Sequence, residues 1–293
     1  MNIKVGNTPL VELKQIATLF DLPGRIFAKV ESYNFTGSIK DRAVFQMLLD
    51  DYESGRINKD TTIIETTSGN TGISLSALGK HFGNKVIIVM PLSASEQRKQ
   101  MIRENQATLV LVNGGMKECN EESLKIQKDL QNSIIFGQFA HKSNAKAHYL
   151  NTAPEIYKDL PNVKYIFAGI GSGGTISGIA AYIHDNKKQT KVIGIEPKES
   201  PLLTKGYAAP HPIQGIGANF VPEILRRDLL DDVVTASSEE SIQMAKRIYE
   251  IENISVGYSS GATLLSAINY MKGHNITDDV VVIFPDKGDR YQW

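Results

Sequence analysis

One lysine of this 293-residue chain stands in a setting that suits an amine nucleophile. Lys40 follows a polar turn that includes Thr36, Gly37 and Ser38, and an apolar, strand-like run at residues 26–30 comes before this turn. A lysine held at a helix start behind such a turn can be desolvated and positioned for covalent chemistry. The same run also fits a plain helix cap, with Lys40 as a solvated side chain of the first turn. Taken alone, the run leaves both interpretations open.

A second polar loop follows the apolar run at residues 62–65 and leads into a helical pattern at residues 73–82. It is rich in hydroxyl, amide and glycine residues: Thr66, Thr67, Ser68, Gly69, Asn70, Thr71 and Gly72. Free backbone N–H groups and the helix dipole at such a helix start favour a bound anion. The loop therefore predicts a site for a carboxylate or a phosphate, with an elaborate capping turn as the alternative.

A third loop contains four glycines between a strand-like run at residues 165–168 and a helical pattern at residues 175–184. Its residues are Gly169, Ile170, Gly171, Ser172, Gly173, Gly174 and Thr175. The glycines let the backbone fold around an anion, and Gly173 and Thr175 favour a cup for one phosphate. The loop also matches G-x-G-x-x-G, and Glu196 stands about where a dinucleotide fold places its ribose-binding acid. A nicotinamide or flavin site is therefore the rival interpretation.

Two further segments near the C-terminus fit the same cavity. Ser259 and Ser260 precede a helical pattern, either as a cap or as a neutral hydroxyl that can bond a pyridine nitrogen without protonating it. Residues 284–291 end a strand-like run with a turn that would help to close the cavity. Their charges also fit a solvated tail.

The elements that must position these loops alternate along the chain. Strands are predicted at residues 26–30, 62–65, 86–90, 108–112, 165–168, 192–195 and 280–284. Helices are predicted at residues 39–52, 73–82, 96–105, 121–130, 145–158, 175–184, 238–252 and 262–271. Such alternation is typical of parallel sheets covered by helices on both faces, whose ligands bind beyond the carboxyl ends of the strands.

Composition narrows the class of partner. The chain has 32 basic and 32 acidic residues, so no net charge attracts nucleic acid or an anionic membrane. No apolar run approaches the roughly 20 residues that span a bilayer. A single cysteine and an N-terminus without a signal-peptide pattern predict a cytoplasmic protein. The six histidines show no metal-ligand spacing, so no metal is predicted, and the expected partner is a small molecule.

One cofactor accounts for a reactive lysine, a cup for one phosphate, a hydroxyl for a pyridine nitrogen and a carboxylate loop: pyridoxal 5′-phosphate. The runs that carry these features resemble the cysteine synthase (O-acetylserine sulfhydrylase) and cystathionine β-synthase family. They are residues 34–42, 67–72, 171–175 and 257–261, together with 5–11, 138–139, 148–149, 154–156, 215–218 and 285–291. The resemblance spans nearly the whole chain in order.

The resemblance implies an α/β protein of pyridoxal-phosphate fold type II. Two domains are expected, each a parallel-rich sheet flanked by helices. Residues 1–36 and 137–293 would form the larger, cofactor-binding domain. Residues 37–136 would form a smaller mobile domain that carries the substrate-carboxylate loop. A homodimer is also implied.

The resemblance assigns a role to each matching residue. Lys40 would form the Schiff base and move the α-proton, Asn70 would bond the ring oxygen, and Ser259 would face the pyridine nitrogen, with Ser260 as the fallback. The phosphate would be held by Gly171, Ser172, Gly173, Gly174 and Thr175. The carboxylate of a small amino-acid substrate would be received by Thr67, Ser68, Thr71 and Gln138.

The reaction implied is β-replacement, in which an amino acid loses a group from its β-carbon to give an enzyme-bound aminoacrylate that a nucleophile attacks. One version makes cysteine from O-acetylserine and sulfide, and the other releases hydrogen sulfide from cysteine with water, giving serine. The alternatives are a serine/threonine dehydratase-type β-elimination and a dinucleotide-dependent oxidoreductase.

Departures from the family pattern bear on the choice of nucleophile. Asn219 and Phe220 replace the usual Gly-Phe, and Asp231 and Asp232 fall where the synthases usually carry Asp-Glu. A shorter second carboxylate would leave space for water, so we hypothesise that Asp232 orients or activates water or a thiol in the second half-reaction. The alternative is an exposed acid pair before a strand.

Overall fold

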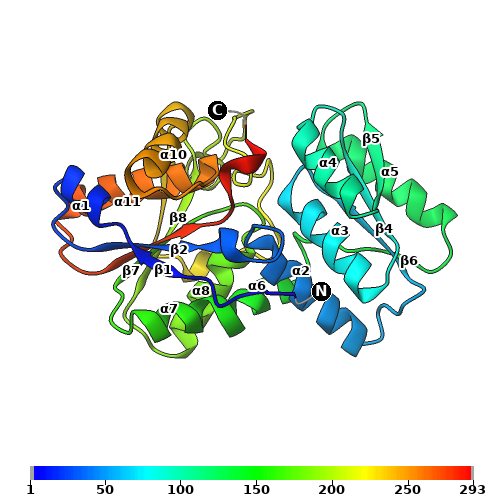
Figure 1. Cartoon of the computed structure of the whole chain (residues 1–293), viewed down its shortest axis with the longest axis horizontal. Helices are drawn as coiled ribbons and strands as arrows, with labels where there is room; N and C mark the ends of the chain where they lie inside the picture. The colour runs from blue at the N-terminus through cyan, green and yellow to red at the C-terminus, as the bar shows by residue number, and fades with distance from the viewer. Residues whose placement is uncertain (1–2, 292–293) are drawn as a thin grey trace.

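The computed structural model describes residues 3–291, which form two sheets with helices on both faces (Figure 1). The chain builds two strands of the first sheet, crosses to build the whole of the second, and then returns to complete the first. This arrangement confirms the predicted α/β class with two parallel-rich sheets.

The larger sheet has six strands. Their spatial order is β1 (Leu10–Glu12), β2 (Ile26–Val30), β10 (Val280–Phe284), β7 (Tyr165–Gly169), β8 (Lys191–Pro197) and β9 (Asp232–Ala236). β1 pairs antiparallel to β2, and the other neighbours are parallel. The helices α1 (Lys14–Leu19), α10 (Ser238–Glu252) and α11 (Tyr258–His274) pack on one face, and α7 (Ala153–Asp159) and α8 (Gly174–Asp185) pack on the other. Because both faces are covered, β2 and β10 are buried along their whole length, and all their residues are apolar apart from the buried Lys29 of β2.

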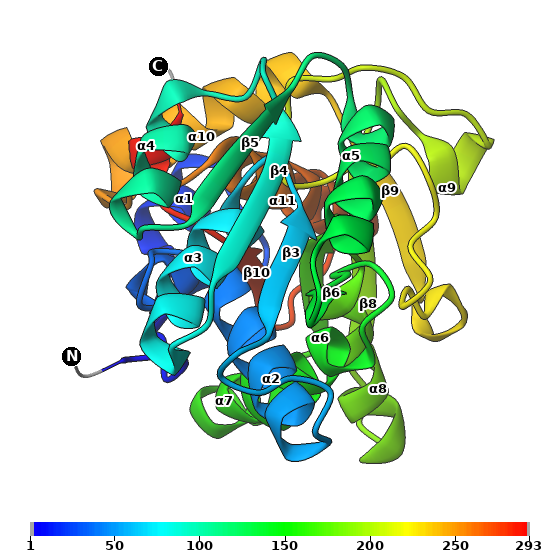
Figure 2. The same cartoon turned by 90° about the vertical axis from the view of Figure 1, so that its right-hand side faces the viewer.

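The smaller sheet has four parallel strands. Their order is β5 (Thr108–Val112), β4 (Val86–Pro91), β3 (Thr62–Thr66) and β6 (Ser133–Ile135). Figure 2 shows this sheet with α5 (Met116–Asp129) on one side and α3 (Asn70–Phe82) and α4 (Glu96–Glu104) on the other, where α2 (Lys40–Glu53) also packs. All four strands lie within residues 37–136, and all six strands of the larger sheet lie outside that range. The exact boundaries of the two domains stay a prediction.

Shorter elements complete the fold. They are α6 (Lys142–Ala147), a π-helical turn (His148–Thr152), α9 (Leu202–Lys205) and three short 3₁₀ turns, Glu31–Tyr33, Arg227–Leu229 and Gly288–Arg290. No helix among residues 3–291 is long and apolar enough to cross a membrane.

All seven predicted strands and all eight predicted helical segments are present. Five elements were not among the predicted ranges: β1 and β6 with three residues each, α9 with four, β9 with five and α1 with six. The shortest of them leave too few residues for a hydrophobic period to show. The helix predicted at residues 145–158 is divided by the π-helical turn at His148–Thr152. The strands β3, β7 and β10 end at one common cavity, so the predicted loops do meet there.

Candidate active site

The amine of Lys40 lies in the cavity between the two sheets. Its helix α2 begins against the end of β10, because the N–H of Ile39 donates to the carbonyl oxygen of Pro285 at 2.7 Å. Asp41 accepts from the backbone N–H and the hydroxyl of Thr36, each at 2.6 Å, which fixes the turn before the helix. The N-cap residue of α2 is Ile39 and no side chain caps the helix, so the plain-cap interpretation is not confirmed; Lys40 is half-buried and lines the cavity.

Enclosure makes the Lys40 amine easier to deprotonate. Burial lowers its pKa from 10.5 to about 8, although the carboxylates of Glu65 and Asp286 act in the opposite direction. Its Nζ atom donates a long hydrogen bond of 3.4 Å to the Ser172 hydroxyl. A large fraction of the amine is therefore neutral near pH 8, as a nucleophile or general base requires.

The glycine loop lies opposite Lys40 at the N-terminus of the 12-residue helix α8. Gly173 is the N-cap residue and has φ +83°, a conformation that favours glycine. A Cβ atom on Gly174 would collide with Oδ1 of Asn144, and one on Gly171 would collide with the carbonyl oxygen of Gly215. The loop thus needs its glycines in order to approach its neighbours, and it leads into a helix N-terminus, which favours a bound anion.

Side chains behind this loop hold its hydroxyls. The Ser172 hydroxyl accepts from Nδ2 of Asn144 at 3.0 Å, and Thr175 bonds Nε2 of His148 at 3.2 Å. Burial and the nearby cations Arg42 and Lys40 keep the pKa of His148 well below its usual value, so this imidazole is neutral. His148 is a buried part of the site that its sequence context did not reveal.

Ser259 lies at the start of α11 and lines a small, deep part of the cavity of about 50 Å³ together with Lys40 and the glycine loop. Ser260 is buried outside this lining, and its hydroxyl has no partner among the described residues. Of the two serines, Ser259 is therefore the one that can face a ring in the cavity.

Asn70 is the first residue of α3 and is held from the other sheet. Its Nδ2 donates to Oδ2 of Asp286 at 2.7 Å, and its Oδ1 accepts from Nη1 of Arg290 at 2.8 Å. Asp286 is 1% exposed and Arg290 is 2% exposed. The alternative of a solvated tail is wrong for Asp286 and Arg290, which are buried and hydrogen-bonded to Asn70. Lys287 and Asp289 of the same segment are exposed.

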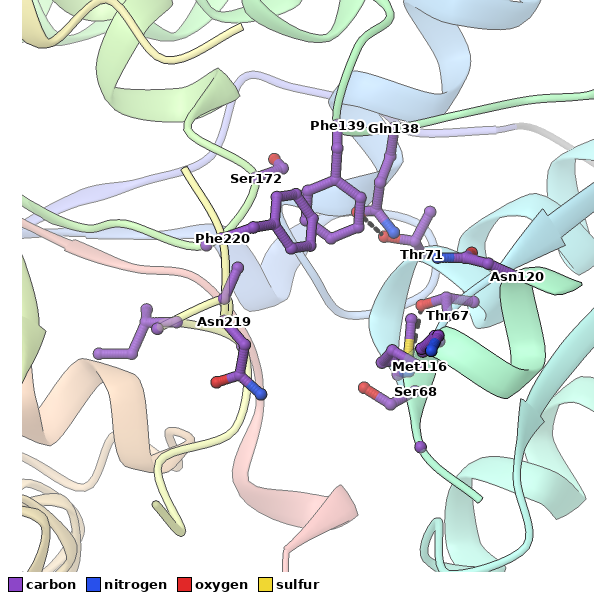
Figure 3. Close-up of a pocket in the computed structure, with 18 of the residues that line it drawn as sticks. Thr67, Ser68, Thr71, Met116, Asn120, Gln138, Phe139, Ser172, Asn219 and Phe220 are labelled. Carbon is purple, nitrogen blue, oxygen red and sulfur yellow. Dashed lines mark hydrogen bonds between the residues drawn. The ribbon is translucent and has the colours of Figure 1, made fainter. Parts of the chain in front are cut away.

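The loop at residues 67–71 and Gln138 form the wall that faces the glycine loop. Thr67, Ser68 and Thr71 all line the cavity, and the Thr71 hydroxyl donates to Oε1 of Gln138 at 2.7 Å. Figure 3 shows these residues on one side of the hollow, with Asn219 and Phe220 across from Ser68. The rings of Phe139 and Phe220 pack edge to face, with 4.9 Å between the ring centroids. The main part of the cavity has a volume of about 810 Å³.

Glu65 is a buried acid behind this wall that the sequence analysis missed. One of its oxygens accepts from the N–H of Gly137 at 2.8 Å, and the other accepts from Nε2 of Gln138 at 3.1 Å. Burial raises the pKa of Glu65 to about 7, although these donors and the ammonium of Lys40 lower it. The signal in the sequence was an acid directly after the apolar residues Ile63 and Ile64.

Two acids singled out by sequence lie apart from the cavity. Asp232 is exposed at the first residue of β9, and its Oδ1 accepts from the N–H of Val233. It pairs with Ile193 in the middle of β8, whereas the cavity lies beyond the carboxyl ends of the strands. Asp232 is therefore not among the residues that line the cavity, and its role in the second half-reaction stays a prediction. Glu196 bonds the N–H groups of Leu203 and Thr204, so its oxygens are not free for a ribose.

The residues that meet here fit pyridoxal 5′-phosphate. The cavity combines a lysine with a lowered pKa, a glycine cup at a helix N-terminus and a buried serine hydroxyl. Asn70 adds an amide whose N–H side is fixed toward the cavity region by Asp286 and Arg290. Among residues 3–291, no cluster of three or more His, Cys, Asp or Glu side chains could hold a metal ion.

Comparisons with known proteins agree with this chemistry. Cysteine synthase B of Campylobacter jejuni subsp. jejuni is 43% identical over 291 residues, which is 98% of this chain and 94% of that protein. Cysteine synthase A of Escherichia coli K12 is 36% identical over 303 residues, which is 99% of this chain and 92% of that protein. A hydrogen sulfide-producing enzyme from Fusobacterium nucleatum has a structure similar to this one, with a TM-score of 0.94 and 37% identity over 98% of this chain and 97% of that chain. The family described as "Pyridoxal-phosphate dependent enzyme" matches residues 1–286, and the chain belongs to this family.

Proposed function

We propose that the enzyme carries out a β-replacement that makes cysteine and acetate from O-acetylserine and sulfide. The observation that carries this proposal is that one cavity is lined by Lys40 and by the wall made of the loop at residues 67–71 and Gln138. A small amino acid whose carboxylate lies on that wall would present its α-carbon to the Lys40 amine. The cysteine synthases among the relatives support the choice of substrate.

Each group of residues would have a separate task. Ser68 and the first N–H groups of α3 would bind the substrate carboxylate, and the second N–H of Gln138 would add a further donor. Lys40 would take the α-proton and hold it on Nζ, where Glu65 and Asp286 favour the charged form. The residues Gly171, Ser172, Gly173, Gly174 and Thr175 would hold the cofactor phosphate, while Asn70 and Ser259 would bond its ring. Bound pyridoxal phosphate would supply the electron sink for charge that develops at the α-carbon.

Release of hydrogen sulfide from cysteine with water, giving serine, is the second candidate. The structural similarity to a hydrogen sulfide-producing enzyme supports it. It would need water at the β-carbon, and Asp232, the acid we expected to activate that water, is exposed away from the cavity. Cysteine synthesis therefore comes first.

Product analysis on the cofactor-loaded enzyme tests this choice. The enzyme is incubated with O-acetylserine and sulfide, and separately with cysteine alone, and cysteine, acetate, serine, sulfide, pyruvate and ammonia are measured. We expect cysteine and acetate in equal amounts from the first mixture, with slower sulfide release from the second. Pyruvate and ammonia as the main products would show a β-elimination instead.

We also propose that the enzyme is a homodimer and that residues 37–136 move as the smaller domain, and the family resemblance supports these two proposals. A cytoplasmic location is proposed from the single cysteine and the absence of a signal-peptide pattern. Light scattering during size-exclusion chromatography tests the dimer, and a mass near the 32.3 kDa of one chain would contradict it. A change in small-angle scattering on addition of the substrate would test the motion.

A further inference from the structure

Two amide side chains in the cavity are each held by a buried carboxylate. Asn70 donates from Nδ2 to Asp286 at 2.7 Å, and Gln138 donates from Nε2 to Glu65 at 3.1 Å. Asp286 is 1% exposed and Glu65 is 2% exposed. Buried acids are rare unless they are paired or functional, and neither of these two forms an ion pair with a described residue.

The chemistry of the partners fixes which way each amide points. An ionised carboxylate only accepts hydrogen bonds and a guanidinium only donates them. Asn70 must therefore turn its NH₂ group to Asp286 and its oxygen to Arg290, which donates at 2.8 Å. Above its pKa of about 7 Glu65 is ionised, and Gln138 then turns its NH₂ group to Glu65 and its oxygen to the Thr71 hydroxyl, which donates at 2.7 Å.

Each amide keeps one N–H after these bonds, and both residues line the cavity. A donor is what a carboxylate or an anionic ring oxygen needs. If either amide turned over, it would present its oxygen to that anion and repel it. The two acids thus decide whether Asn70 and Gln138 attract or repel a ligand.

Further bonds show that each acid is itself held in place. Tyr291 donates to Oδ2 of Asp286 at 2.6 Å, and the second oxygen of Asp286 is buried without a partner among the described residues. Gly137 donates its N–H to Glu65 at 2.8 Å. Both carboxylates also act on the Lys40 amine, where they favour the ammonium.

We propose that Glu65 and Asp286 are positioning residues: Glu65 orients Gln138 toward the substrate carboxylate, and Asp286 orients Asn70 toward the cofactor ring oxygen. This inference rests on the proposed function, which gives Gln138 and Asn70 these ligands. It predicts that the two acids affect different ligands although both lie near Lys40.

Glu65→Gln and Asp286→Asn test the proposal with crossed measurements on the cofactor-loaded enzyme. Loss of a hydrogen bond that orients a charged ligand weakens its binding by about tenfold or more. Glu65→Gln should raise the Kd of O-acetylserine or L-serine by that factor and leave the cofactor absorption spectrum and cofactor Kd unchanged. Asp286→Asn should shift the visible absorption maximum and raise the cofactor Kd, with a smaller effect on the amino acid.

Glu196→Gln is the matched control, because Glu196 is 2% exposed and accepts backbone N–H groups outside the cavity. It should change neither measurement. If either test variant fails to fold, Glu65→Asp and Asp286→Glu replace them, because both keep the carboxylate. Glu65→Asp should change the Kd of the amino acid less than Glu65→Gln, and Asp286→Glu should change the spectrum and the cofactor Kd less than Asp286→Asn.

Two results would overturn the proposal. One is a Kd for the amino acid within twofold of the parent in Glu65→Gln. The other is a spectrum and cofactor Kd in Asp286→Asn that equal those of the parent. Since both measurements report binding rather than products, they stay valid if the replaced group proves not to be acetate.

Discussion

Both walls of the cavity include a helix N-terminus, but they differ in how far their other donors are side chains. On the side of the six-stranded sheet, the glycine loop offers backbone N–H groups at the start of α8, and its shape depends on residues that have no side chain. On the side of the four-stranded sheet, Thr71 and Gln138 offer side chains whose direction depends on Glu65. Backbone donors are fixed by the fold itself, whereas amide and hydroxyl donors must be turned by their neighbours.

This difference suits the two ligands. A cofactor that stays bound needs a permanent cup, and a substrate that enters and leaves needs donors that can change partners. Lys40 lies between the two walls and has to serve both. Substitutions on the cup should therefore change cofactor binding, those at Thr71 and Gln138 should change substrate binding, and those at Lys40 should change both.

The largest effect is expected for Lys40→Ala, which removes the only amine that lines the deep part of the cavity among the described residues. General bases contribute about 10²–10⁴-fold, so turnover should fall by at least about 10³-fold when the covalent role is lost as well. Turnover rate and visible absorption measure the loss. The control is Lys59→Ala, which changes an exposed lysine and should behave like the parent. A Lys40→Ala enzyme with ordinary turnover would refute the scheme.

Gly174→Ala should break the cup. A Cβ atom there collides with Oδ1 of Asn144, and overpacking of this kind costs about 1–3 kcal/mol. The cofactor Kd should rise by about tenfold or more, which fluorescence titration of the cofactor-free protein measures. Gly273→Ala adds the same atom in open space on α11 and should bind the cofactor like the parent. Equal Kd values for the two variants would show that the cup tolerates a side chain.

Thr71→Val tests the side-chain wall. It keeps the shape of the residue but removes the hydroxyl that donates to Gln138, so KM for the amino acid should rise by about tenfold. The cofactor Kd should stay the same. Ser76→Ala is the control, since that hydroxyl of the same helix donates back to Gly72 outside the cavity. A cofactor Kd that rises as much as KM would mean that the walls are not separate.

Lys40 also predicts a pH dependence. Burial lowers its pKa to about 8, and the amine attacks only when neutral, so cofactor uptake by the cofactor-free protein should speed up as pH rises. The neutral fraction grows roughly fivefold between pH 7 and pH 8 and less than about twofold from there to pH 9. Stopped-flow absorption measures the rate. A rate that kept rising toward pH 10.5 would instead indicate a solvated lysine.

The backbone wall was predictable from the sequence, and the side-chain wall was predictable in part. Lys40 and the loops at residues 67–71 and 171–175 are contiguous runs whose composition indicates their use. Asp286 and Glu65 were missed because their partners are 216 and 73 residues away along the chain, and only burial reveals that they orient an amide. Asp232 shows the converse: its place in the sequence suggested a role, but it lies at the start of β9, away from the residues that line the cavity, so that role stays a prediction.

Asp232→Asn should therefore have the smallest effect of all. The residue is exposed, and within the described chain its carboxylate bonds the N–H of Val233, so an amide can replace it at little cost. Cysteine synthesis and sulfide release should each stay within about twofold of the parent, because surface substitutions of this kind usually change stability by under about 0.5 kcal/mol. Initial rates of both reactions measure it, with Glu65→Gln as the buried counterpart. If sulfide release alone fell by tenfold or more in Asp232→Asn, the exposed acid would have to reach the cavity in a conformation other than this one, and the second candidate reaction would gain the group it now lacks.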